Sequence, residues 1–192
     1  MEELNPEIVG EYTTLNDGDY FVIRNFNKMR AFFMTVVSAN NHWMFISSNG
    51  ALTAGRINPD SAFFPYYTDD KITDSAGITG SKTIIRVQTE DGIKVWQPFN
   101  GQLEGFYNTT SNLYKNREGN KLVFEEVNHD LDLIFRYSWS FSEKYGIVKK
   151  SELINIGKDD HSINLLDGIQ NILPFGITQS LEEMCILLLL EI

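Results

Sequence analysis

The chain has 192 residues, of which 42% are hydrophobic and 12% aromatic, and its formal net charge is −10. This length favours a single domain with a real hydrophobic core. The acidic balance and the scattered basic residues argue against nucleic-acid binding, because phosphate contacts need clustered Lys and Arg. They favour a neutral or cationic ligand instead.

Cysteine and histidine usage gives no sign of a disulfide or a metal site. Cys185 is the only cysteine, and it lies in an apolar run that favours a buried, inert thiol. His42, His129 and His161 lie apart, without metal-ligand spacing. The amino terminus lacks a basic and apolar signal sequence, and no run of 18 apolar residues occurs. We therefore expect a cytoplasmic protein with no metal, no cofactor, and no nucleic-acid or membrane partner.

The pattern along the chain is that of an all-β protein. Residues 1–19 are polar and are expected to form an N-terminal arm or a short first strand. In residues 20–178, short β-rich runs alternate with turns made of Gly, Asn and Asp, which is typical of a sandwich or barrel. We predict a two-sheet antiparallel β-sandwich. The expected strands are Tyr20–Arg24, Ala31–Ser38, Trp43–Ser47, Thr83–Gln88, Ile93–Gln97, Lys121–Val127, Leu131–Phe141, Gly146–Ile156 and His161–Leu166.

The clearest strand is Leu131–Phe141, where every second residue is apolar and the residues between are mostly polar. A helix would scatter these side chains around its axis, so period two indicates a strand with one buried face. Trp139 lies on that face and is expected in the core. The pair Ile84–Val87 and Ile93–Trp96, joined through Asp91-Gly92, predicts a hairpin.

Other residues allow less specific expectations. Trp43 and Trp96 follow strand alternation, which favours core or half-buried positions. The paired acids Glu125-Glu126 and Asp159-Asp160 are expected to be solvated strand ends and turns. No glycine-rich phosphate loop or nucleophile elbow is present.

The segment 43–74 combines a strand, a turn at Asn49-Gly50 and a long stretch without a simple period. The four aromatic residues that follow the turn, within residues 63–67, argue for an ordered loop, since disordered segments tend to lack them. Aromatic faces and carboxylates suit a sugar, although the aromatics could equally cover a satellite core and the acids could simply be turn residues. The residues expected to bind a carbohydrate or to face another domain are Asn49, Arg56, Asp60, Phe63, Phe64, Tyr66, Tyr67, Asp69 and Asp70.

The last residues, 179–192, are predicted to form a short helix. Ser180 and Glu183 have the spacing of a capping box. The run Ile186–Leu190 would cover all sides of that helix with apolar side chains. We therefore expect the helix to promote self-association or to bind a partner, because exposed apolar patches usually mark interfaces.

The order of these features resembles a known family over about residues 20–178. A strand ends in the turn Ile46–Gly50, a long aromatic loop follows, and a strand pair closes on Trp96-Gln97-Pro98. Paired strands then run through Val123–Ile156 and Ser162–Gly168. This order is similar to the N-terminal β-sandwich domain of cellobiose-phosphorylase-like glycoside phosphorylases and related glycoside hydrolases. Arg56-Ile57-Asn58-Pro59-Asp60 departs from the family, which tends to have a glycine-rich segment there.

The resemblance implies a sandwich that supports a catalytic (α/α)6 barrel and lends loop residues to a sugar site. It carries over no catalytic residue, because the barrel would hold the catalytic carboxylate. The leading hypothesis is thus a non-catalytic domain of a carbohydrate-active enzyme, with the residues after 178 beginning a linker. The alternatives are a free-standing carbohydrate-binding module and a small hydrolase that uses the acids of residues 60–74. The hydrolase has the least support, since no nucleophile–base pair can be assembled from the sequence.

Overall fold

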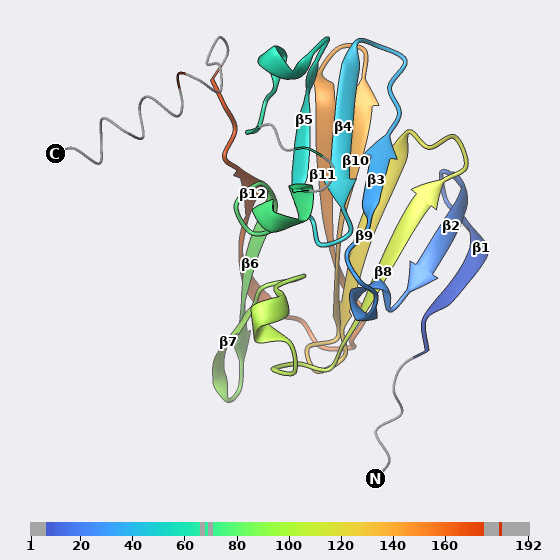
Figure 1. The fold of residues 1–192 in the computed structure, drawn as a ribbon. Coiled ribbons are helices and arrows are strands. Elements are labelled where there is room, and N and C mark those ends of the chain that lie inside the picture. The colour runs from blue at the N-terminus through green and yellow to red at the C-terminus, as the bar shows by residue number, and fades with distance from the viewer. Residues whose placement is uncertain (1–6, 66–67, 69–70, 175–180, 182–192) are drawn as a thin grey trace, which may run out of the picture.

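The computed structural model describes residues 7–65, 68, 71–174 and 181, and within them the fold is all-β. Three antiparallel sheets form (Figure 1). The large sheet has the strand order β1-β2-β8-β9-β10-β11. Its strands are β1 (Val9–Leu15), β2 (Gly18–Arg24), β8 (Thr109–Asn116), β9 (Lys121–Asn128), β10 (Leu133–Ser142) and β11 (Gly146–Asn155).

Two smaller sheets have three strands each, in the orders β3-β4-β5 and β12-β6-β7. Their strands are β3 (Phe33–Val36), β4 (His42–Ser47), β5 (Leu52–Arg56), β6 (Gly80–Thr89), β7 (Gly92–Trp96) and β12 (Ser162–Gln170). Short 3-10 helices connect the strands: η1 (Phe26–Lys28), η2 (Pro59–Ser61), η3 (Ile72–Ser75) and η4 (Gly101–Leu103). Figure 1 shows the β12-β6-β7 sheet on the left and β1 and β2 at the opposite side.

One hydrophobic core joins all three sheets. Ile46 of β4, Ile85 of β6 and Phe135 of β10 are fully buried in the same cluster. At its centre, the rings of Phe124 and Tyr137 stack at 4.8 Å with an angle of 8° between their planes. The sandwich therefore consists of the six-stranded sheet and a second layer that is divided into two sheets, where the sequence predicted one.

The alternation in 131–141 and the predicted hairpin are both confirmed. Leu133, Phe135, Tyr137 and Trp139 of β10 are each at most 3% exposed. The strands β6 and β7 pair in register from Ile85↔Trp96 to Thr89↔Gly92. Trp96 is also buried, as its alternation suggested, and it belongs to the common core.

Other predictions need correction or cannot be compared. Val9–Leu15 pairs with β2, so this part of the N-terminal segment is a first strand. The strands β5 and β8 were not predicted from the sequence. Glu125 and Glu126 are not solvated, because they are only 4% and 7% exposed in the middle of the large sheet. The helix predicted for residues 179–192 lies outside the described residues, apart from Leu181.

Burial of the two glutamates is possible because β9 points them to opposite faces, where each finds donors. Glu125 accepts hydrogen bonds of 2.8 Å from the amide of Asn112 and the hydroxyl of Tyr114, and it forms an ion pair with Arg136. These partners come from the neighbouring strands β8 and β10 on one face of the sheet. Glu126 faces the interior, beside the cavity described next.

Candidate functional site

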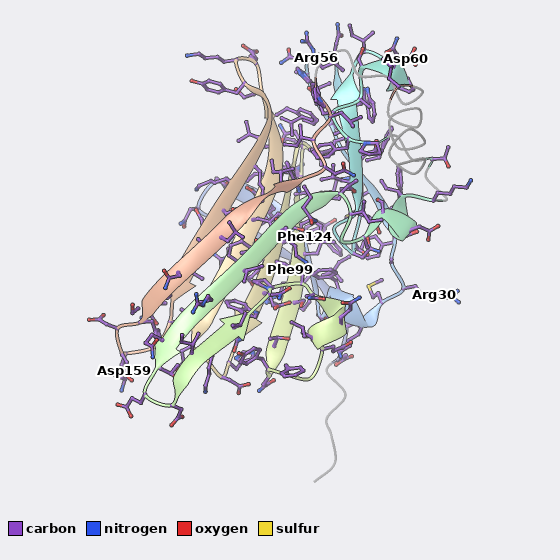
Figure 2. The ribbon with its side chains drawn as sticks, turned by 90° about the vertical axis from the view of Figure 1, so that its left-hand side faces the viewer. Arg30, Arg56, Asp60, Phe99, Phe124 and Asp159 are labelled. Carbon is purple, nitrogen blue, oxygen red and sulfur yellow. The ribbon has the colours of Figure 1, made fainter. Side chains whose placement is uncertain are left out.

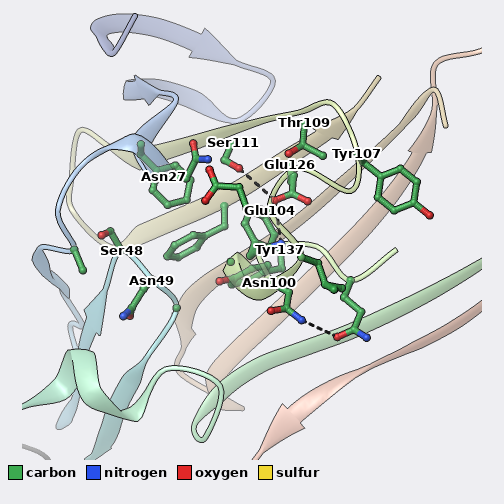
Figure 3. A pocket seen from close by; sticks show the side chains of 18 of the residues that line it. Asn27, Ser48, Asn49, Asn100, Glu104, Tyr107, Thr109, Ser111, Glu126 and Tyr137 are labelled. Carbon is green, nitrogen blue, oxygen red and sulfur yellow. Dashed lines mark hydrogen bonds between the residues drawn. The ribbon is translucent and has the colours of Figure 1, made fainter. Parts of the chain in front are cut away.

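A cavity of about 220 Å³ opens between the large sheet and three connecting segments. Its walls come from η1, from the turn between β4 and β5, and from the segment that links β7 to η4 and β8. Its floor is formed by inward-facing side chains of β8, β9 and β10, as Figure 3 shows in close view. The cavity therefore collects residues that are far apart in the sequence. We call it the Glu126 cavity after the carboxylate at its floor.

Glu126 accepts three hydrogen bonds inside the protein. The indole Nε1 of Trp96 donates to Oε1 at 2.9 Å, and the backbone amide of Phe99 donates to Oε2 at 3.0 Å. The Ser111 hydroxyl also donates to Oε2, at 3.2 Å. Burial raises the pKa of Glu126 above its usual value, while these three donors act in the opposite direction. The carboxylate thus fixes two aromatic residues that line the cavity.

Phe99 has a backbone conformation that non-glycine residues seldom adopt, with φ of +61°. Such strain persists only when the surroundings fix the residue. Here the amide is held by Glu126, and the ring packs edge-on against Tyr137 at 5.3 Å and Phe124 at 6.0 Å. The next residue, Asn100, accepts a hydrogen bond from Gln102 N and so caps η4. The cavity wall around Phe99 is therefore fixed before any ligand arrives.

The rim of the cavity is polar and carries an acidic group. Figure 3 labels the rim side chains Asn27, Ser48, Asn49, Asn100, Glu104 and Thr109. Glu104 forms an ion pair with Lys28 at 2.6 Å, and Asn100 donates to the Gln97 side chain at 3.0 Å. No Lys, Arg or His lines this cavity in the part of the chain that the structure describes. The cavity therefore combines aromatic walls with carboxylate and amide groups.

The residues predicted from the sequence are placed in three different settings. Asn49 lines the cavity, and its side-chain amide donates to the Thr73 carbonyl at 3.1 Å. Phe64 is buried in the core, and Phe63 packs against that core. These two aromatics thus cover core, which was the alternative interpretation of the loop.

Arg56 and Asp60 are exposed and do not line the cavity. Figure 2 places both at one end of the molecule, away from Phe99 and Phe124 in its middle. The remaining predicted residues lie outside the described residues. They are Tyr66, Tyr67, Asp69 and Asp70.

Sequence reasoning missed most of the Glu126 cavity. Its floor combines β8, which was not predicted, with Glu126, which was expected in solvent. A usable signal was present in the adjacent pair Glu125-Glu126 within a strand of otherwise apolar pattern. Because alternate strand residues face opposite sides, one of the two acids had to point toward the core and required buried donors.

No group of three His, Cys, Asp or Glu side chains suited to a metal occurs among the residues with described positions. Within that same part of the chain, none of the helices has the length and hydropathy needed to cross a bilayer. A scan against protein-family models and a search of curated proteins find no match to this chain.

Proposed function

We propose that this β-sandwich is a carbohydrate-binding protein module and that the Glu126 cavity holds one sugar ring. A volume of about 220 Å³ is below the roughly 300–1,000 Å³ typical of sites for drug-sized ligands, so the cavity suits a single ring. A sugar ring offers an apolar C–H face and an edge of hydroxyl groups. A site for it needs aromatic surface next to hydrogen-bonding groups.

The observation that carries this proposal is the position of the Glu126 carboxylate between Trp96 and Phe99. Each carboxylate oxygen can accept more than one hydrogen bond, and Oε1 accepts only one from the described residues. A sugar hydroxyl can donate to the remaining capacity. The amide of Asn27 at the rim offers both donors and an acceptor to further hydroxyls. The aromatic rings exclude water from these contacts.

The charge of the cavity agrees with a neutral sugar. The Glu126 carboxylate at the floor, without a cationic side chain in the described lining, disfavours an anionic ligand, whereas Glu104 at the rim is paired with Lys28. The net charge of −10 acts in the same direction. A neutral polyol has no such penalty and can use the carboxylates as acceptors.

Calorimetric titration of the protein with glucose, mannose, xylose and N-acetylglucosamine tests the proposal. We expect at least one of them to bind. For that sugar, Asn27→Ala should weaken binding by about threefold to tenfold, the loss of one hydrogen bond. Asn164→Ala, at an exposed position of β12, is the matched control and should bind normally. If none of the four sugars binds, or if both variants behave alike, the proposal is wrong.

A second candidate function is a supporting domain in a larger carbohydrate-active enzyme, as the resemblance of the sequence implies. The outer face of the β12-β6-β7 sheet favours it. By strand register, Leu166, Val95 and Ile93 point to this outer face, and their exposed fractions are 67%, 43% and 54%. An apolar surface of this kind often marks an interface, here with a catalytic (α/α)6 barrel.

The supporting role predicts a difference between this chain and a longer protein that includes the barrel. Leu166→Lys should leave the isolated sandwich as stable as the wild type, because this side chain is exposed. In the longer protein, the same substitution should lower the melting temperature. If Leu166→Lys changed the melting temperature of the isolated sandwich and of the longer protein by the same amount, the supporting role would be contradicted.

A further inference from the structure

We infer that a second cavity beside the first holds the next unit of the same ligand, so that the preferred ligand is at least a disaccharide. The inference rests on the proposed function of the Glu126 cavity. The second cavity, of about 550 Å³, is lined by the segments 76–79, 81–83 and 97–102. We call it the Lys82 cavity.

The two cavities are neighbours that share a wall. Asn49, Gly50, Tyr137 and the turn at Phe99-Asn100 belong to the lining of both. The shared turn is rigid, since the Phe99 amide is held by Glu126 and the Asn100 side chain by Gln97. A ligand unit in the Glu126 cavity therefore has the Lys82 cavity next to it, along these shared residues.

Small residues keep the Lys82 cavity open. At Gly77 and Gly101, an added Cβ would meet no other atom within 4 Å, so open space adjoins both positions. Next to this cavity, the start of β6 lies close to the turn between β4 and β5. A Cβ on Gly80 would meet the carbonyl oxygen of Gly50 at 2.5 Å, which joins the start of β6 to the turn between β4 and β5. The cavity is therefore open at Gly77 and Gly101.

The groups available to a ligand in the Lys82 cavity differ from those in the first. The hydroxyls of Thr79 and Thr83 are engaged: Thr79 accepts from Leu52 N at 3.2 Å, and Thr83 donates to Asp167 at 2.7 Å. Lys82 has no ion-pair partner among the residues whose positions are described. Its ammonium group offers three donors.

Ile78 adds an apolar surface to the same cavity, with 51% of the residue exposed to solvent. A second sugar unit would therefore receive hydrogen bonds from Lys82 and an apolar contact from Ile78. The Glu126 cavity supplies a carboxylate acceptor at its floor, whereas the Lys82 cavity supplies an ammonium donor. Two linked units can satisfy both groups at once, which one unit cannot do.

Calorimetric titration with matched pairs of sugars tests this inference. The pairs are glucose and cellobiose, mannose and mannobiose, xylose and xylobiose, and N-acetylglucosamine and chitobiose. For the sugar that binds, we expect the disaccharide to bind at least about tenfold more tightly than the monosaccharide. Lys82→Ala and Ile78→Ala should each weaken the disaccharide by about threefold to tenfold and leave the monosaccharide unchanged.

Matched controls lie at exposed positions outside both cavities. Lys158→Ala and Ile156→Ala remove the same side-chain types near the connection from β11 to β12, and both should bind like the wild type. Equal affinities for monosaccharide and disaccharide, with no effect of Lys82→Ala or Ile78→Ala, would overturn the inference and leave the proposed function standing. Absence of binding to all four monosaccharides would reject the proposed function and, with it, this inference.

Discussion

Glu126 links the hydrogen bonding of the core to the shape of the cavity. Its carboxylate holds the Trp96 indole and the Phe99 amide, and both are donors only. A side chain that carries N–H groups of its own cannot accept from both at these positions. The requirement for a buried acceptor that carries no N–H group explains why the burial cost of Glu126 is tolerated.

We predict that Glu126→Gln destabilises the protein by about 1–3 kcal/mol, the usual cost of leaving a buried donor unsatisfied. The NH₂ group of Gln would face either the indole or the Phe99 amide. Urea titration followed by circular dichroism measures the change. Glu143→Gln, at an exposed position between β10 and β11, is the control and should stay within about 0.5 kcal/mol of the wild type. If Glu126→Gln left the free energy of unfolding unchanged, the three donors would not depend on the carboxylate.

Glu126 also makes the stability of the folded protein depend on pH, in a direction that its pKa shift defines. Because burial raises the pKa of Glu126, the folded state holds the proton more tightly than the unfolded state. The stability that this group contributes is full below the ordinary pKa of Glu and is lost as the pH rises through the raised value. The stability difference between wild type and Glu126→Gln should therefore shrink from pH 4 to pH 7. A difference that grows over this range would mean that the donors outweigh burial.

At the scale of the elements, the large sheet and the β12-β6-β7 sheet are joined by a buried ion pair. Lys149 of β11 contacts Asp167 of β12 at 2.6 Å, and their side chains are only 5% and 20% exposed. Burial would raise the pKa of Asp167, but hydrogen bonds from Lys149 and Thr83 outweigh it and the pKa is lowered. The Asp167 carboxylate therefore stays ionised in the folded protein at neutral pH.

Lys149→Met should destabilise the protein by about 3–5 kcal/mol at pH 7, because it leaves a largely buried carboxylate without its cation. Since the folded pKa of Asp167 is lowered, the stability from this pair is present above the ordinary pKa of Asp. It is lost as the pH falls through the lowered value. The effect of Lys149→Met should accordingly diminish in acid. The neighbour Lys150 is 66% exposed in its ion pair, and Lys150→Met should cost no more than about 1 kcal/mol in the same denaturation series.

The interior face of β10 provides a direct test of the sandwich. Phe135 is fully buried, so Phe135→Ala should cost about 3–5 kcal/mol in denaturant titration. Phe106 is 76% exposed, and Phe106→Ala should change stability by less than about 0.5 kcal/mol. A loss under about 1 kcal/mol for Phe135→Ala would place this face in solvent and contradict the fold.

Whether a strand could be predicted from the sequence depended on the surroundings of its two faces. The strand β10 has one apolar and one polar face, so its alternation indicated a strand directly. In β5, Leu52 to Gly55 are all buried, so both faces carry small or apolar residues and no alternation arises. In β8, buried Ser111 and Asn112 interrupt the apolar pattern because Glu126 and Glu125 provide their partners. Local patterning therefore failed where both faces of a strand are buried, as in β5, and where polar pairs replace apolar contacts, as in β8.

The candidate site was predictable at Asn49 alone, because a turn residue between two strands is visible locally. The other groups around the cavity, such as Trp96, Phe99 and Glu126, belong to segments that meet only after the sheets have formed. The aromatic residues led to the prediction of a sugar site, but that site was predicted in the segment 54–74. Of its aromatics, Phe63 and Phe64 cover the core instead.

For the whole molecule, we propose that a sugar binds in the Glu126 cavity rather than at the exposed end near Arg56 and Asp60. A ¹⁵N-labelled sample titrated with the four monosaccharides and their four disaccharides distinguishes the two places. The Trp96 indole N–H and the Phe99 amide both report on the floor, because each donates directly to Glu126.

We expect the resonances of the Trp96 indole N–H and the Phe99 amide to shift in a saturable manner with a sugar that binds. Resonances of the exposed loop at Lys158 should stay fixed. Shifts confined to residues around Arg56 and Asp60, or no saturable shift at Trp96 and Phe99 with any of the eight sugars, would contradict the assignment of this cavity as the binding site.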